Sequence, residues 1–284
     1  MNIAVIGSGY VGLITGLCLS KIGNQVRCID LNEGIIKNLN LGIPHFFEEG
    51  LQGLLRSEID SGRFKASSKL ENFDLEFEII IIAVGTPSDS EGNIDLNYIK
   101  SASKYVGRFI KKSESFFSIV IKSTVLPSTT DTLVREIIEN ESSKVLGEFG
   151  LGMNPEFLRE GTAIEDFMNP DRIVIGTEDE ETKSKLEKLY SSWNCEKIFV
   201  NSRTAELIKY TNNCFLALQI SASNEIANLA YNIGGIDVED VLEGVHLDKR
   251  WNPIKNGERS YPGILKYLKA GCGFGGSCFP KDVK

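Results

Sequence analysis

The sequence predicts an α/β protein: a doubly wound, mostly parallel sheet followed by a helical connecting domain. Two patterns indicate this fold class. Over residues 1 to about 200, apolar runs of strand length alternate with amphipathic stretches of helical period, and from about residue 204 a long helical pattern follows. Strands that are apolar on both faces and joined by helices are typical of parallel sheets. We therefore expect two domains, residues 1–200 and 201–284.

The strands of the first domain are predicted from apolar runs. These runs are Ile3–Ile6, Val26–Ile29, Ile79–Val84, Phe117–Ile121, Arg172–Ile175 and Lys197–Val200. Helical periodicity between them predicts helices that include Leu13–Ile22, Leu51–Ile59, Leu96–Ile110 and Thr130–Ile138. The second domain is predicted to begin with a helix from Thr204 to about Asn232, with Ser202 as its N-cap and Glu206 in its first turn.

The composition describes a soluble globular chain. Of the 284 residues, 42% are hydrophobic and 25% are charged, and the formal net charge is -8. Such an acidic chain is not expected to have nucleic acid or an anionic membrane surface as its main partner. The apolar runs are too short to span a membrane and the amino end lacks signal-peptide features, so we expect a cytoplasmic protein. The cysteine spacings match no metal site or disulfide scaffold, and no metal is expected.

The first chemical motif is a glycine-rich turn after the first strand. Gly7, Gly9 and Gly12 have G-x-G-x-x-G spacing, and they stand between a predicted strand and a predicted helix. Such glycines form a tight turn and let backbone N–H groups approach a pyrophosphate at the positive end of the helix, as in Rossmann-like folds. Asp30 ends the second strand, where its carboxylate would bind the adenosine ribose and repel a 2′-phosphate. The motif therefore predicts NAD rather than NADP.

Two further turns follow strands at the same carboxyl edge of the predicted sheet, which is the ligand edge in this type of fold. One turn is Val84-Gly85-Thr86-Pro87, and the other is segment 122–127, which contains Thr124. Both threonines are candidates for contact with the cofactor or the reacting group. By spacing alone they could equally be N-caps or turn hydroxyls.

Two pairs of polar residues four positions apart are candidates for catalysis. In a helical turn Glu156 and Glu160 would face the same way, as general acid-base chemistry on a bound water requires. Lys209 and Asn213 would share one face of the long helix and could hold an oxyanion. By spacing alone, the glutamates are more typical of a solvated helix, and the second pair is as typical of an exposed polar stripe.

The strongest local signal is the segment 271–282, Gly-Cys-Gly-Phe-Gly-Gly-Ser-Cys-Phe-Pro-Lys-Asp. A cysteine among glycines has an approachable backbone and leaves room for a substrate. Lys281 and Asp282 are close enough in sequence to adjust a thiolate at Cys278 or to manage its proton. The alternative is a flexible glycine linker that ends in an incidental cysteine.

In this order the segments resemble the UDP-glucose and GDP-mannose dehydrogenase family over residues 2–282. The resemblance rests on the three glycines of the first turn and on these further motifs: Gly-Thr-Pro at 85–87, Lys-Ser-Thr at 122–124, Asn-Pro-Glu-Phe-Leu at 154–158, Ala-Glu-Leu-Ile-Lys at 205–209 and Gly-Gly-Ser-Cys-Phe-Pro-Lys-Asp at 275–282. It implies a nucleotide-sugar dehydrogenase that converts an alcohol to an acid through an aldehyde and a thioester, using two NAD molecules in turn.

The resemblance also implies roles for single residues. Cys278 matches the nucleophile, Lys209 and Asn213 match the pair that stabilises the oxyanion, and Asp282 matches the acid that orients a water and the lysine. Glu156, Glu160 and Thr124 match positions that are associated with cofactor contact and thioester hydrolysis. The resemblance does not decide which of the two glutamates activates the water. Cofactor binding is implied for Gly7, Gly9, Tyr10, Val11, Gly12, Asp30, Gly85, Thr86, Thr124, Glu160 and Lys281. Substrate binding is implied for Phe157, Leu158, Lys209, Asn213, Gly273, Phe274 and Gly275.

Family members normally continue past the position of Lys284 into a further domain that binds the nucleotide sugar. We therefore expect a truncated chain that binds NAD and turns over weakly or not at all. UDP-glucose is the expected substrate, and the product suggests polysaccharide or cell-envelope precursor synthesis. Segment 247–267 is longer than expected for UDP-glucose enzymes, which leaves UDP-N-acetylmannosamine, UDP-N-acetylglucosamine and GDP-mannose as alternatives.

Two interpretations of other kinds also remain. One is a two-electron dehydrogenase of the hydroxyacid type, which would need no cysteine. The other is a noncatalytic module that binds NAD and dimerises. Apolar residues lie on more than one side of the long helix that starts near Thr204, which is more than one packing face requires. This pattern predicts a homodimer through that helix.

Overall fold

The computed structural model describes residues 1–73, 76–89, 91–276 and 279–283. The chain divides into two compact units. Unit 1 comprises residues 1–89 and 94–209, and unit 2 comprises residues 90–93 and 210–284.

Unit 1 is built on a mostly parallel sheet, as predicted from the apolar runs. The strands described are β1 (Asn2–Ile6), β2 (Gln25–Ile29), β3 (Phe64–Ser67), β4 (Ile79–Ile82), β5 (Ser118–Ile121), β6 (Gly150–Met153), β7 (Arg172–Gly176) and β8 (Glu196–Val200). Their order in the sheet is β3-β2-β1-β4-β5-β6-β7-β8. Neighbouring strands are parallel except β6 and β7, which pair antiparallel.

Two strands of the sheet were not predicted from the sequence. Strand β3 is short and includes the exposed Lys65, and β6 has the sequence Gly-Leu-Gly-Met. Glycine has no side chain to pack and weakens the local strand signal. Strand β6 forms because tertiary packing encloses it, with all four residues buried.

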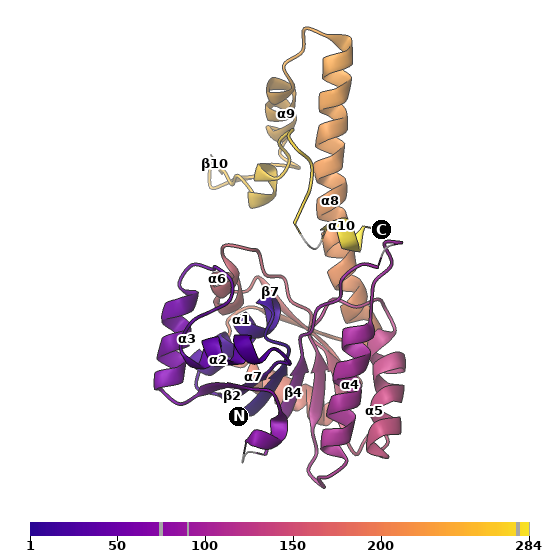
Figure 1. Ribbon diagram of the computed structural model, residues 1–284. Coiled ribbons are helices and arrows are strands. Elements are labelled where there is room, and N and C mark those ends of the chain that lie inside the picture. Colours follow the sequence, from indigo (N-terminus) through magenta and orange to yellow (C-terminus); the bar gives the residue numbers. More distant parts are fainter. Residues whose placement is uncertain (74–75, 90, 277–278, 284) are drawn as a thin grey trace. The chain divides into compact units, whose positions relative to one another are not determined.

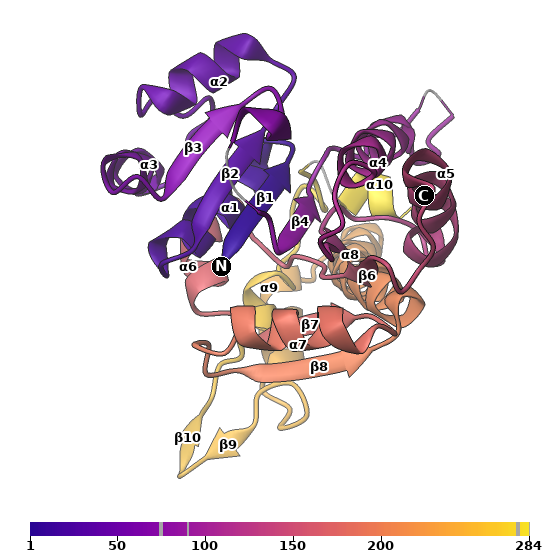
Figure 2. The ribbon, with the colours of Figure 1, turned by 90° about the horizontal axis from the view of Figure 1, so that it is seen from below.

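Helices cover both faces of the sheet, so the doubly wound architecture is confirmed (Figures 1 and 2). One face carries α1 (Tyr10–Lys21), α2 (Glu33–Asn40) and α3 (Leu51–Asp60), together with α6 (Ala163–Met168) and α7 (Glu180–Leu189). The other face carries α4 (Asn97–Ile110), the π-helical turn η2 (Thr129–Val134) and α5 (Arg135–Ser142). A short 3-10 turn, η1, spans Leu70–Asn72. Alternate residues of β1 point into the two resulting cores, with Ile3 and Val5 in one and Ala4 and Ile6 in the other.

The long predicted helix is α8 (Ser202–Ile233), but its N-cap differs from the prediction. Asn201, not Ser202, caps the helix, because its Oδ1 atom accepts a hydrogen bond of 2.7 Å from the Thr204 N–H. Glu206 in the first turn of α8 is fully buried and accepts hydrogen bonds from the Ser128 and Thr130 N–H groups at 2.7 and 2.8 Å. Helix α8 thereby holds the start of η2 within unit 1.

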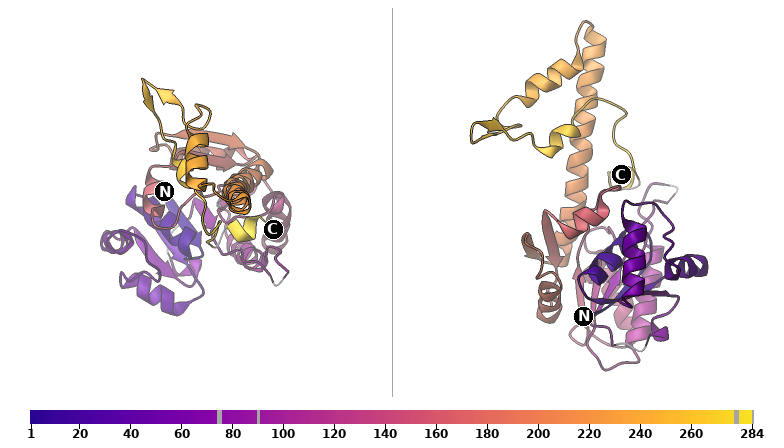
Figure 3. Two further views of the ribbon diagram at one scale, coloured as in Figure 1. Left: turned by 90° about the horizontal axis from the view of Figure 1, so that it is seen from above. Right: turned by 90° about the vertical axis from the view of Figure 1, so that its left-hand side faces the viewer.

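Unit 2 begins inside helix α8, which is followed by a helix and a hairpin on one side of α8 (Figure 3) and by further short elements. The elements after α8 are α9 (Val238–His246), the hairpin strands β9 (Ile254–Lys255) and β10 (Glu258–Arg259), the turn η3 (Gly263–Lys266) and α10 (Phe279–Asp282). The hairpin lies in segment 247–267, for which the sequence analysis predicted no strand. Among the described residues, no helix has the length and apolar content needed to cross a membrane.

Candidate active site

The glycine-rich turn lies at the carboxyl end of β1, and two of its glycines are required by close approach of the backbone. Gly7 has a φ of +98°, and a Cβ there would lie 2.8 Å from the Ala83 carbonyl oxygen. A Cβ at Gly12 would lie 2.0 Å from the carbonyl oxygen of Gly7. Around Gly9 the space is open, because a Cβ there would meet no atom within 4 Å. The turn therefore packs tightly against the rest of the protein at Gly7 and Gly12 and is accessible at Gly9.

Helix α1 starts directly after Gly9, and no side chain among the described residues caps it. Its first N–H groups are consequently available to an anion, which the positive end of the helix dipole would favour. Tyr10 and Val11, which the family resemblance implies for cofactor binding, are half-buried in its first turn. This turn fits the pyrophosphate of a dinucleotide.

Asp30 lies at the end of β2, as predicted, and is held by three hydrogen bonds. Its Oδ2 atom accepts from the Ser8 N–H at 2.9 Å and from the Ser8 hydroxyl at 2.5 Å, while its Oδ1 atom accepts from the Asn32 N–H at 2.9 Å. Partial burial raises the pKa of the carboxyl, but these hydrogen bonds outweigh burial and lower the pKa below its ordinary value. A carboxylate ionised at neutral pH can accept hydrogen bonds from a ribose.

The turns after β4 and β5 contact each other at the same edge of the sheet. The Thr86 hydroxyl donates to the Thr124 carbonyl oxygen at 2.9 Å, and the Ser123 hydroxyl donates to the Val84 carbonyl oxygen at 2.6 Å. Thr86 thus serves as a turn hydroxyl, one of the two alternatives that its spacing left open. Gly85 is exposed beside it.

A buried ion pair joins the loop after β6 to helix α8. The Lys209 ammonium lies 2.9 Å from Glu156 Oε1, and both side chains are almost fully buried. The second oxygen of Glu156 accepts a hydrogen bond of 2.6 Å from the Leu158 N–H. The aromatic ring of Phe157 lies near two cations, with the Arg172 guanidinium 3.8 Å and the Lys209 ammonium 5.3 Å from its centroid.

The shared helical face that spacing suggested for Glu156 and Glu160 is not present. Residues 154–159 are not helical, and Glu160 is exposed in a turn whereas Glu156 is buried. The two carboxylates therefore have different environments. The partner of Glu156 is a lysine distant in sequence, which four-residue spacing could not reveal.

Lys122 is a second buried lysine near this pair, and sequence analysis did not single it out. Its ammonium donates to the backbone and side-chain oxygens of Asn154 at 3.2 and 2.9 Å. The Tyr190 hydroxyl donates to the same side-chain oxygen at 2.6 Å. Burial lowers the pKa of Lys122 to about 8, with Glu156 raising it and Lys209 lowering it further. The sequence feature that could have indicated Lys122 is its position directly after an apolar strand.

In unit 2, the predicted polar residues also form a cluster. The Asn213 side-chain amide donates to Asp282 Oδ2 at 2.7 Å, and both residues are buried. The Lys281 ammonium pairs with the other oxygen of Asp282 and lies 5.8 Å from the centroid of the Tyr210 ring. Cys278 lies outside the described residues.

The glycine-rich segment before Cys278 is mostly exposed. Gly273 has a φ of +87°, a conformation that favours glycine, and Gly275 is exposed. The ring of Phe274 makes an edge contact with Phe279, with centroids 6.2 Å apart.

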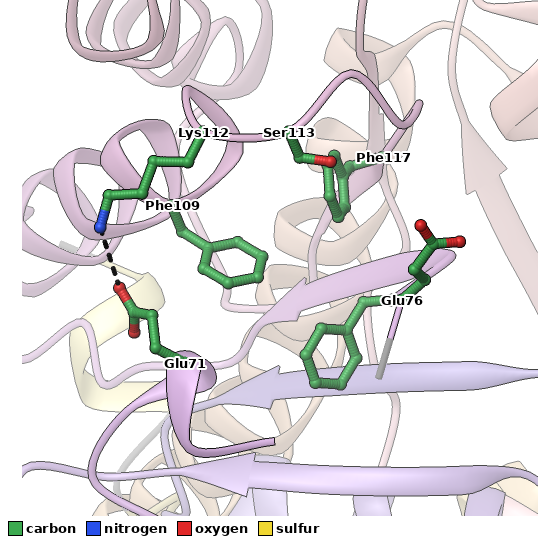
Figure 4. Close-up of a pocket in the computed structure, with 7 residues that line it drawn as sticks. Glu71, Glu76, Phe109, Lys112, Ser113 and Phe117 are labelled. Atoms are coloured by element: carbon green, nitrogen blue, oxygen red, sulfur yellow. Dashed lines mark ion pairs between the residues drawn. The ribbon is translucent and has the colours of Figure 1, made fainter. Parts of the chain in front are cut away.

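A pocket of about 330 Å³ lies elsewhere in unit 1 and is separate from these residues. Figure 4 shows Phe109 and Phe117 in its wall, with Lys112 paired to Glu71 at 3.8 Å. Phe117 directly precedes β5, so the pocket lies at the amino ends of the parallel strands, opposite to the glycine-rich turn. We therefore assign it no part in the candidate site.

Two family models match the chain. The NAD-binding-domain model of the UDP-glucose/GDP-mannose dehydrogenase family matches residues 1–194, and its central-domain model matches residues 203–284. The chain is 42% identical over 283 residues to the UDP-glucose 6-dehydrogenase YwqF of Bacillus subtilis, covering 100% of this chain and 60% of that protein.

Two solved structures are also similar. A UDP-glucose dehydrogenase from Pyrobaculum islandicum has 41% identity and a TM-score of 0.89, covering 99% of this chain and 62% of the other. A GDP-mannose dehydrogenase from Pseudomonas aeruginosa has 36% identity and a TM-score of 0.84, with 99% and 62% covered. The chain therefore spans about 60% of the length of these relatives.

Proposed function

The chain belongs to the UDP-glucose/GDP-mannose dehydrogenase family, with NAD as its cofactor, and from this premise we propose that its protein oxidises the C6 hydroxymethyl group of a nucleotide sugar to a carboxylate. The reaction removes four electrons in two steps and consumes one water. When bound, NAD supplies the acceptor for the two electrons of each step. The residues of this chain bind and orient the reactants and manage protons.

The buried pair of Lys209 and Glu156 is the observation that carries this proposal. An ammonium that is almost fully buried, 2.9 Å from one carboxylate, still has donors that can bind an oxyanion. Its position is held before any substrate arrives, which is the condition for electrostatic catalysis. Simple cofactor binding would not require a buried cation on α8.

The further roles follow the family resemblance. We propose that Lys209 and Asn213, one helical turn apart on α8, stabilise the alkoxide and later the thiohemiacetal oxyanion, with Asp282 orienting the water and lysine that take up the alcohol proton. Cys278 would attack the aldehyde to form a thiohemiacetal, whose oxidation gives a thioester. Glu156, Glu160 and Thr124 would serve cofactor contact and hydrolysis of this thioester. A covalent intermediate keeps the aldehyde from escaping between the two oxidations.

UDP-glucose is the substrate that we propose, because relatives at 42% and 41% identity are named for it. A GDP-mannose dehydrogenase is also structurally similar, at 36% identity, so the nucleotide base and the sugar of the substrate are to be tested. A UDP-uronate product would supply polysaccharide precursors.

The yield of NADH per UDP-glucose tests the reaction. We expect two NADH from a version extended through the part that the longer relatives carry, and NAD binding with little or no turnover from these 284 residues alone. One NADH per substrate would favour a two-electron dehydrogenase, and binding without turnover of any nucleotide sugar in either version would favour a noncatalytic module.

The role of Cys278 can be tested separately in the extended version. Cys278→Ser should produce little acid, because a hydroxyl is a much weaker nucleophile than a thiolate, whereas Cys272→Ser is the matched control and should retain activity. Mass spectrometry of the protein after mixing with substrate should detect a covalent adduct only when Cys278 is present. Acid production by Cys278→Ser at the normal rate would exclude this assignment.

We also propose a homodimer through helix α8. An exposed stripe on the helix consists of Phe215, Leu218, Ala222, Ile226, Leu229 and Ile233, spaced three or four residues apart. Leu218→Glu should convert the dimer to a monomer in light-scattering measurements, because a charge would be desolvated in an apolar interface. Leu41→Glu, a substitution of similar exposure in unit 1, is the control. Equal masses for both variants would contradict the proposed interface.

A further inference from the structure

A buried glutamate outside the residues assigned so far connects distant parts of unit 1. Glu48 is 4% exposed. Its Oε2 atom accepts hydrogen bonds from the Tyr10 hydroxyl at 2.6 Å and the Gly161 N–H at 3.0 Å, and its Oε1 atom accepts from the Ala163 N–H at 2.8 Å. These three partners are uncharged donors, so charge-assisted hydrogen bonds satisfy the buried carboxylate.

The segments that meet at Glu48 come from opposite sides of β1 in the sheet. Glu48 lies between α2 and α3, in the part of the chain that follows β2, whereas Gly161 and Ala163 lie in the chain that follows β6. The sheet order places β2 on one side of β1 and β6 on the other. Tyr10, the first residue of α1, stands between them and follows Gly9 directly.

The phenol of Tyr10 is a fixed donor in this arrangement. Burial raises the pKa of Tyr10 well above its ordinary value, and the hydrogen bond and charge of Glu48 raise it further. Tyr10 therefore keeps its proton, and its ring packs 5.0 Å from that of Phe46. Removing the carboxylate would take away the shorter of the two hydrogen bonds of the Tyr10 hydroxyl and the acceptor of the Gly161 N–H.

The adenosine end of the dinucleotide site does not depend on Glu48. Asp30 is held by Ser8 and Asn32, and the turn at Gly7 and Gly12 is held by backbone contacts. The loop next to Glu160 follows β6, which the sheet order separates from β2 by β1, β4 and β5. A change at Glu48 should thus affect the two ends of the cofactor unequally.

We propose that Glu48 is a positioning residue for NAD: it holds Tyr10 and the 160–163 loop in the geometry that receives the nicotinamide half of the cofactor. This inference rests on the proposed role of Glu160 and the glycine-rich turn in cofactor binding. It adds a residue that joins the turn at α1 to the loop of Glu160.

Glu48→Gln is the sharpest substitution, because it preserves shape but replaces an acceptor oxygen with an N–H group that would face a backbone N–H. We expect the Kd for NADH to rise about ten-fold, and the Kd for ADP-ribose, which lacks nicotinamide, to rise less than about three-fold. Glu49→Gln removes the same charge from the exposed neighbouring residue and should leave both constants unchanged. Nicotinamide fluorescence and calorimetry on this 284-residue chain measure the two ligands.

Tyr10→Phe provides a milder second variant if Glu48→Gln does not fold. It removes one hydrogen bond and should weaken NADH binding by about three-fold. In the double variant that combines Tyr10→Phe with Glu48→Gln, the two losses of binding free energy should not add. Equal NADH affinity in the Glu48→Gln and Glu49→Gln variants would overturn the proposal, as would equal losses for NADH and ADP-ribose, which indicate a general folding defect. Absence of NADH binding to the unsubstituted chain would instead contradict the cofactor site itself.

Discussion

Helix α1 in unit 1 and the part of helix α8 in unit 2 show how differently the two units use apolar residues. All residues of α1 from Gly12 to Ser20 are buried, because the helix lies between the sheet and neighbouring helices. In α8, Ala217 and Ile220 are buried while Phe215 and Leu218 are 60% and 64% exposed. A sheet with helices on both faces encloses its connecting helices, whereas a long helix packed on one side leaves an apolar stripe open.

The difference in enclosure also bears on buried charge. Unit 1 can hold buried charges such as Lys209 and Glu156 because the surrounding core is closed and supplies partners. Unit 2 buries few large apolar side chains among its described residues, and its exposed stripe suits association. Unit 1 thus holds the ion pair of Lys209 and Glu156 within a closed core, and unit 2 is expected to gain stability from a second copy.

The largest expected effect is that of Gly12→Val, which places a side chain against the backbone of the dinucleotide turn in unit 1. The new Cβ would lie 2.0 Å from a backbone oxygen, so the turn must move. We expect loss of measurable NAD binding and a decrease of at least about 4 kcal/mol in unfolding free energy. Gly53→Ala, on the open face of α3, should change stability by less than about 1 kcal/mol. Similar effects of both substitutions on NAD affinity, measured by calorimetry, would contradict the assigned role of the turn.

The same substitution in the two helices tests the comparison directly. Leu17→Ala in α1 should lower the unfolding free energy by about 3 kcal/mol, because it leaves a cavity in a closed core. Leu218→Ala in α8 should cost less than about 0.5 kcal/mol when the protein is measured as a dilute monomer. Urea unfolding followed by circular dichroism measures both. Equal losses would mean that unit 2 is as closed as unit 1.

Buried charge in unit 1 should appear as a pH dependence of stability. The pKa of Lys122 is about 8 in the folded chain, compared with an ordinary value of 10.5. Between these values the unfolded chain binds a proton that the folded chain does not, so stability rises with pH, by up to about 3 kcal/mol. Lys122→Met should lose this increment between about pH 8 and pH 10.5, whereas Lys21→Met at an exposed position should keep it. A wild-type pH profile in Lys122→Met would show that Lys122 is not the source.

The smallest expected effect concerns the cap of the helix that the two units share. Asn201→Ala should lower stability by about 1 kcal/mol, because the Thr204 N–H loses its acceptor. Asn201→Asp keeps an acceptor oxygen and should be close to wild type in thermal unfolding. If Asn201→Ala is as stable as Asn201→Asp, the cap contributes nothing to α8.

Several features of the site could be predicted from the sequence because they depend on a few adjacent residues. The apolar runs predicted the parallel strands, and the glycine spacing predicted a turn whose Gly7 has a positive φ. Asp30 was predicted because it ends a strand at a known distance from that turn. The family motifs, matched in order, predicted the dehydrogenase family and its NAD cofactor.

Other features were decided only by the tertiary structure. Local periodicity and the steric limits of glycine act within a few residues, so the sequence by itself determined the fold class and the dinucleotide turn. The Glu156–Lys209 pair, in place of a pair of glutamates on one helical face, and the contacts of Lys122 with Asn154 depend on the order of the strands. Glu48 reaches Gly161 across 113 positions in sequence. Such partners become neighbours only when the sheet brings their segments together, because each buried polar group takes the partner that packing places beside it.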